Sequence, residues 1–159
     1  MAKEHFTNDH LEFTDQIKRE LLAPAGHGVT QVVYMVFAEL PYERFAIHYV
    51  KGETNNLCIR FWNDTLDKVR FSLGIYNLDR IAIKESKIEL SSSQVKMLDN
   101  LANIKPVVTE FRGVILDGYA YQLTLCKENQ QTYEWRHHSQ IDSSMKKLLD
   151  KLVEFAQLS

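Results

Sequence analysis

The sequence predicts an α+β fold, in which a largely antiparallel sheet of about six or seven strands packs with three helices. Two observations predict this fold. Several short segments alternate apolar and polar residues, which is typical of strands with one buried face, and short turns separate them. Three other segments repeat apolar residues every three or four positions, which indicates amphipathic helices.

The first predicted helix begins near Asp9 and ends before Pro24. Its apolar residues recur every four positions, at Phe13, Ile17 and Leu21. This spacing places the three side chains on one narrow stripe, so we expect this helix to bury a single face.

Strands follow the first helix. The alternation predicts them over residues 31–39, 43–51, 57–63 and 69–76. Segment 78–88 is ambiguous, and an irregular fifth strand there stays open. Because a parallel crossover needs a dozen or more residues, the short connections favour antiparallel neighbours.

The second and third helices have clear start signals. Ser91 and Gln94 match the spacing of a capping box, and Pro106 ends the second helix because the residue before a proline is pushed out of the helical region. The third helix begins near Asp142. Its wide apolar stripe consists of Ile141, Met145, Leu148, Leu149, Leu152, Val153 and Ala156.

A meander is predicted between these two helices. An apolar strand ending at residue 116 leads into Asp117-Gly118, a frequent two-residue hairpin turn, and an alternating strand follows through Leu125. A further strand carries Tyr133 and Trp135. We expect the last helix to cover the apolar face of this meander.

Size, charge and composition narrow the class of protein. The chain has 159 residues, which suits one domain over residues 1–159. The net charge of −2 and the absence of a Lys/Arg cluster argue against binding nucleic acid through its phosphates. The beginning of the sequence lacks signal-peptide features, and no apolar run is long enough to cross a bilayer, so we expect a cytoplasmic protein without membrane contact.

The sequence contains no motif for catalysis or for a metal site. His137 and His138 are neighbours on a predicted strand and point to opposite faces, so they are poorly placed to share an ion. Cys58 and Cys126 lie inside predicted strands without a Cys-x-x-Cys pair, and we interpret them as reduced thiols. No catalytic residue, metal or cofactor is therefore predicted.

Four residues are candidates for contact with a partner: Arg60, Trp62, Arg136 and His138. Trp62 shares a predicted strand face with Arg60, and both residue types are frequent at binding hot spots. If a helix covers that face, Trp62 belongs to the core instead. Arg136 and His138 are expected on the face away from Trp135, where simple solvation is the alternative.

A resemblance adds one expectation about function. Segment 115–118, followed by Tyr121-x-Leu123 and Tyr133-x-Trp135, resembles a pattern in small bacterial immunity proteins of polymorphic or contact-dependent toxin systems. The resemblance covers residues 115–159 and implies a cytoplasmic protein that binds and blocks a toxin, without catalytic residues of its own.

We therefore expect a protein-binding module of the immunity type. Two alternatives stay open. One is a small-molecule-binding protein or enzyme that uses His48, His137 and His138. The other is a structural subunit that forms homo-oligomers, such as a homodimer, through a sheet edge or the last helix.

Overall fold

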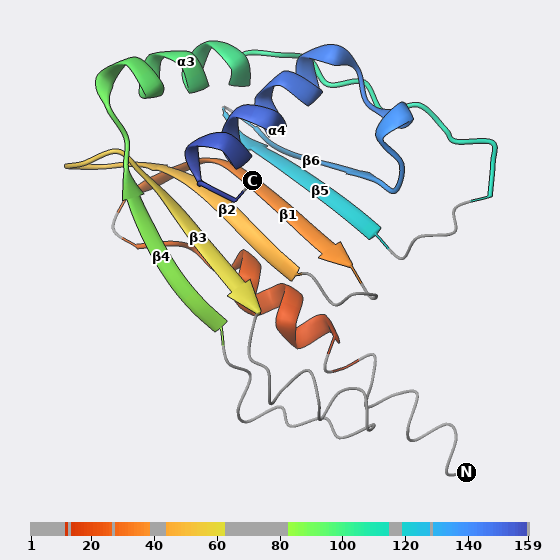
Figure 1. Ribbon diagram of the computed structural model, residues 1–159, viewed down its shortest axis with the longest axis horizontal. Helices are drawn as coiled ribbons and strands as arrows, with labels where there is room; N and C mark the ends of the chain where they lie inside the picture. Colours follow the sequence, from red (N-terminus) through yellow and green to blue (C-terminus); the bar gives the residue numbers. More distant parts are fainter. Residues whose placement is uncertain are drawn as a thin grey trace.

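The described residues form a six-stranded sheet with the strand order β4-β3-β2-β1-β5-β6, in which all neighbours are antiparallel (Figure 1). The computed structural model describes residues 12, 14–26, 28–38, 44–62, 83–114, 119–127 and 129–158. The strands are β1 (Val29–Ala38), β2 (Arg44–Lys51), β3 (Asn56–Trp62), β4 (Ile83–Glu89), β5 (Tyr119–Cys126) and β6 (Gln130–Trp135).

Helices lie on both sides of this sheet. They are α3 (Ser92–Ala102), α4 (Ser143–Phe155), the short η2 (His138–Gln140) and a helical segment over residues 14–22, called helix 14–22 below. An antiparallel sheet packed with helices is the α+β class that the sequence predicts. Among the described residues, no helix is both long and apolar enough to span a membrane.

One face of the sheet is covered by α3 and α4, which lie together on that side (Figure 1). The apolar side chains of the two helices meet alternate residues of the strands, and this cluster is the main core. Its buried helix residues are Leu98, Ala102, Met145, Leu148, Leu149 and Leu152. The strand residues at its centre include Tyr34, Ile47, Ile59 and Leu123.

The opposite face is covered by helix 14–22 only in part. Ile17 and Leu21 are fully buried there, as the four-residue spacing predicts. They pack against a second cluster from β1, β2 and β3, consisting of Met35, Phe37, Ala46 and Trp62. Among the described residues, β5 and β6 contribute no buried side chain to this cluster, and no described helix covers their half of the face.

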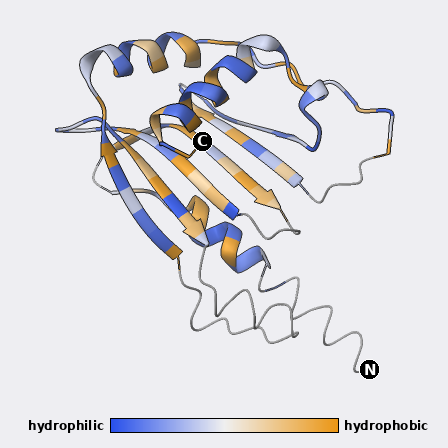
Figure 2. Ribbon diagram, in the orientation of Figure 1, coloured by the Kyte–Doolittle hydropathy of each residue, from blue (hydrophilic) through white to orange (hydrophobic). Residues whose placement is uncertain are grey.

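The strands differ in character according to their place in the sheet. The central strands β1 and β2 are mostly buried and apolar, whereas the edge strand β4 is mostly exposed and polar (Figure 2). Charged side chains on an edge strand discourage pairing with other chains. Lys84, Glu85 and Lys87 are exposed charged residues of β4.

The predicted starts of the second and third helices are confirmed, whereas the predicted start of the first helix near Asp9 lies outside the described residues. The Gln94 backbone N–H donates to Ser91 Oγ at 3.2 Å, and the Ser91 backbone N–H donates to Gln94 Oε1 at 2.9 Å, which completes the capping box. Asp142 caps α4 by accepting a hydrogen bond from the Met145 backbone N–H at 3.0 Å. These caps satisfy backbone groups that would otherwise lack partners.

The predicted strand before the Asp117-Gly118 turn is wrong over the residues that the structure describes. Residues 111–114 are irregular, and Val114 is 82% exposed. β5 pairs with β1 on one side and with β6 on the other, so no position beside it is left for a hairpin partner. The turn itself and the strand predicted over 69–76 lie outside the described residues.

Candidate functional site: a groove beside helix 14–22

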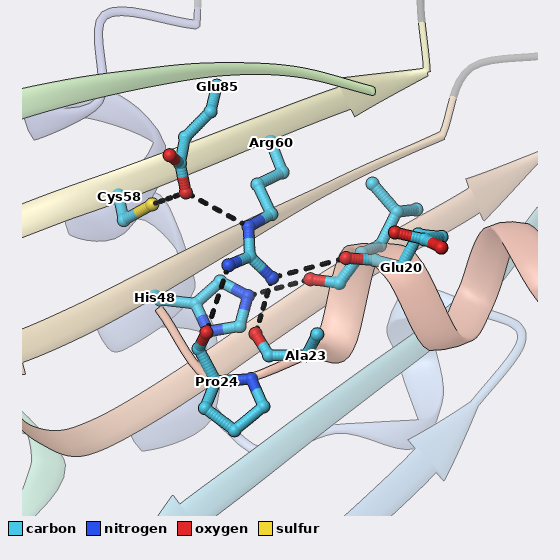
Figure 3. Close-up of polar contacts among 8 residues, drawn as sticks. Glu20, Ala23, Pro24, His48, Cys58, Arg60 and Glu85 are labelled. Atoms are coloured by element: carbon cyan, nitrogen blue, oxygen red, sulfur yellow. Dashed lines mark hydrogen bonds and ion pairs between the residues drawn. The ribbon is translucent and has the colours of Figure 1, made fainter. Parts of the chain in front are cut away.

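Arg60 holds the end of helix 14–22 against the sheet (Figure 3). Its guanidinium reaches from β3 and donates to the backbone carbonyls of Glu20 at 3.1 Å, Pro24 at 3.1 Å and Ala23. The last carbonyls of a helix lack partners within the helix and carry partial negative charge, so a cation is well suited to bind them. The Arg60 Nε–H also donates to Glu85 at 3.1 Å, which balances the charge.

Glu85 links Arg60 to Cys58. The Cys58 thiol donates to Glu85 Oε1 at 2.9 Å, and burial together with this bond raises the pKa of Cys58 to about 12. The same two hydrogen bonds, from Cys58 and Arg60, lower the pKa of Glu85. With this raised pKa, the Cys58 thiol stays protonated at neutral pH and acts as a hydrogen-bond donor. It is a poor nucleophile, because only a thiolate is a strong one.

His48 is a second support for helix 14–22. Its Nε2 lies 2.7 Å from the backbone oxygen of Leu21, so this nitrogen carries the proton and donates it. Nδ1 is buried and has no hydrogen-bond partner in the described part of the chain. Burial lowers the pKa of His48, although the bond to Leu21 opposes this effect. His48 is therefore neutral at neutral pH and serves the packing of the helix.

The half of this face that no described helix covers carries mostly polar side chains from β5 and β6. Strand alternation and register place Ala120, Gln122, Thr124, Cys126, Gln130, Thr132 and Glu134 on it. The hydroxyls of Thr124 and Thr132 are 3.0 Å apart and bond across the two strands. Gln130, Thr132 and Glu134 are exposed, in contrast to the buried residues under helix 14–22.

Two pockets lie between helix 14–22 and this polar half-face. The larger has a volume of about 430 Å³, and among the residues that line it are Lys18, Phe37, Gln122, Glu134 and Arg136. The smaller has a volume of about 250 Å³, and its lining includes Leu22, Pro24, Val33, His48, Gln122, Thr124, Gln130 and Thr132. Gln122 lines both pockets, so they adjoin at this residue, and the two pockets together are called the groove below.

The structure separates the four predicted partner-binding residues. Trp62 is 1% exposed and lies in the cluster under helix 14–22, as expected for a helix-covered face. The Arg60 side chain is 11% exposed and is engaged with the helix end. Arg136 lines the groove. Arg136 is thus the one member of this set that lies in the groove.

His138 does not share a face with Arg136. It begins η2, and its ring lies 4.9 Å from that of Tyr121, whose hydroxyl is 3.3 Å from His138 Nε2. Tyr121 packs against the core on the α3–α4 side of the sheet. The shared face expected from strand alternation is wrong because the strand ends at Trp135, before either residue.

The three histidines of the enzyme alternative have separate surroundings. His48 is buried beneath helix 14–22, whereas the His137 ring stacks on Phe111 at 4.5 Å and its Nδ1 lies 2.7 Å from Ser139 Oγ. In the part of the chain that the structure describes, no group of three or more His, Cys, Asp or Glu side chains could hold a metal ion.

Sequence reasoning missed most of the groove. Gln122 and Thr124 alternate with the apolar residues of β5, and this pattern did indicate one polar face. The contribution of Lys18 and Glu134 depends on where helix 14–22 docks on the sheet. No local pattern determines that position, so the sequence alone could not bring these residues together.

Within the described residues, fold and groove define an α+β arrangement whose antiparallel sheet is covered by helices on one face and half covered by a helix on the other. No protein-family model, curated protein or solved structure matches the chain.

Proposed function

We propose that this protein is a binding module that holds an extended segment of a partner protein in the groove. The observation that carries the proposal is the half of the sheet face that no described helix covers, where β5 and β6 present polar side chains beside a firmly held helix. This function needs no catalytic group, because the groove supplies shape and hydrogen-bonding groups.

The chemistry of the groove suits a polypeptide. Gln122 and Gln130 carry amides that can donate and accept hydrogen bonds, and the exposed Thr132 hydroxyl, already bonded to Thr124, keeps capacity for a further hydrogen bond. Peptide backbones offer the same two kinds of group. The two pockets are open and follow one another along the helix, which favours an extended chain over a compact ligand enclosed on all sides.

The helical wall of the groove is held in place before any partner arrives. Arg60 and His48 both bind backbone carbonyls near the end of helix 14–22. A preorganised wall reduces the conformational entropy lost on binding, and more of the contact energy then appears as affinity.

The resemblance of residues 115–159 to immunity proteins supports a finer proposal. In this version the partner is a toxin, and the protein neutralises the toxin by holding it at the groove. Arg136, which lies in the resembling segment and lines the groove, is then a direct contact.

Where a neighbouring gene encodes a toxin, co-expression with that toxin tests this version of the proposal. Thr132→Arg places a long cation on the exposed floor of the groove, whereas Ser144→Arg places the same side chain on the exposed side of α4, across the sheet. We expect the Thr132→Arg variant to lose protection of growth and the Ser144→Arg variant to keep it. Full protection by Thr132→Arg together with loss in Ser144→Arg would show that the binding surface lies elsewhere.

A further inference from the structure

The larger pocket of the groove carries two cations from opposite walls. Lys18 comes from helix 14–22, and Arg136 follows the end of β6. Within the described part of the chain, neither forms an ion pair, because the three salt bridges there use Lys51, Arg60 and Lys151. Both charges are thus available to a bound group.

Their present contacts are weak. Lys18 Nζ lies 4.8 Å from the centre of the Phe37 ring, and Arg136 Nε is 3.5 Å from the backbone oxygen of Tyr119. The second distance is at the limit of a hydrogen bond. The two side chains therefore lose little when a carboxylate binds between them, and an Arg guanidinium can bind both oxygens of that carboxylate.

Glu134 is the single acidic residue among the described residues that line this pocket. The lining thus has two positive charges against one negative charge. The smaller pocket has no Lys, Arg, Asp or Glu among its described lining residues, and its His48 is neutral because burial lowers its pKa. The groove is consequently cationic at one end and neutral at the other.

We propose that the partner segment places an acidic side chain, Asp or Glu, between Lys18 and Arg136, and lays neutral residues along Thr124 and Thr132. This inference rests on the proposed function and names the chemistry of the partner. Apolar side chains of Met35, Phe37 and Ala120 also line the cationic pocket. They shield the carboxylate from water on one side, which strengthens its attraction to the two cations.

Removing the negative charge of Glu134 should change the affinity for the acidic segment in the opposite direction to removing a positive charge. The Glu134 carboxylate repels an acidic side chain bound in the same pocket, so Glu134→Gln is expected to strengthen binding. Lys18→Gln and Arg136→Gln are expected to weaken it. Since single exposed ion pairs contribute up to about 1 kcal/mol, each change should alter the dissociation constant about two- to five-fold.

Two blocked peptides, acetyl-Thr-Ser-Glu-Ser-Thr-amide and the same peptide with Gln in place of Glu, serve as probes. Each is titrated into the full chain and followed by two-dimensional NMR of backbone and side-chain amides. We expect the Glu peptide to shift the signals of Gln122 and Arg136 and to bind more tightly than the Gln peptide. Raising the salt concentration should reduce this preference.

The Thr132→Arg variant separates failure of this inference from failure of the proposed function. If both peptides bind equally well, the charge variants have no effect and Thr132→Arg abolishes binding, the acidic preference is overturned and the groove remains the binding surface. If the peptides shift only signals outside the groove, or none at millimolar concentration, both proposals are overturned.

Discussion

The two halves of one sheet face differ in what their side chains do. Beneath helix 14–22, Trp62 is buried and Arg44 is stacked between the rings of Phe37 and Trp62, at 4.1 and 4.7 Å. Beside the helix, the polar side chains of Gln130, Thr132 and Glu134 on β6 are exposed. Large aromatic and cationic residues therefore hold the helix, and small polar ones form the surface that is available to a partner.

The largest expected difference between the halves is in stability. Trp62→Ala removes a fully buried ring beneath helix 14–22 and is expected to lower the free energy of unfolding by about 3–5 kcal/mol. Thr132→Ala, on the exposed half, is expected to change it by less than about 0.5 kcal/mol. Urea denaturation measures both. Equal effects at the two sites would remove the distinction between the halves.

Arg60→Met tests the clamp on the helix end. The substitution keeps most of the apolar stem but removes the donors for three backbone carbonyls and for Glu85. Hydrogen bonds that involve a charged group typically contribute more than neutral ones, so we expect a loss of about 2 kcal/mol. Arg60→Lys keeps the charge but lacks the planar guanidinium, so it should recover only part of the lost stability. Full recovery would contradict a role for the guanidinium geometry.

Protonation of His48 should make the free energy of unfolding depend on pH. Because burial lowers its pKa in the folded protein, the unfolded chain binds more protons once the pH falls below the ordinary value of 6.5. The stability from neutral His48 is therefore complete above pH 6.5 and declines as the pH falls toward the folded pKa. His48→Gln, which retains a donor for Leu21, should reduce this acid-dependent loss in denaturation curves. An unchanged loss in the variant would assign the effect to another group.

The smallest expected effects on stability belong to the charged residues of the groove. Lys18→Gln, Glu134→Gln and Arg136→Gln remove no ion pair in the described structure and should each alter the unfolding free energy by less than about 0.5 kcal/mol. Thermal unfolding compared with the unchanged protein measures this. A loss above 2 kcal/mol in any of the three would show that the residue supports the fold.

Local signals made much of the fold predictable. Strand alternation located β1, β2 and β3, and the capping residues Ser91 and Asp142 located the starts of α3 and α4, because each signal depends on residues close in sequence. The hairpin before β5 was predicted from an equally local signal. It is wrong for residues 111–114 because strand neighbours are set by distant contacts, and β1 occupies that side of β5.

The candidate site was less predictable for the same reason. Trp62 and Arg60 have the composition of a binding surface, but their role is decided by where helix 14–22 docks. Arg136 was predicted as a partner contact and lies in the groove, whereas His138 turns to the other side because β6 ends before it. Both outcomes depend on packing between segments that are far apart in the sequence.

Hydrogen–deuterium exchange of the chain alone and in complex with a partner protein recovered by pull-down would locate the binding surface. If β5 and β6 form that surface, the partner should slow exchange in β5, β6 and helix 14–22 and leave α3 unchanged. Slower exchange in α3 with no change in β5 and β6 would contradict the account.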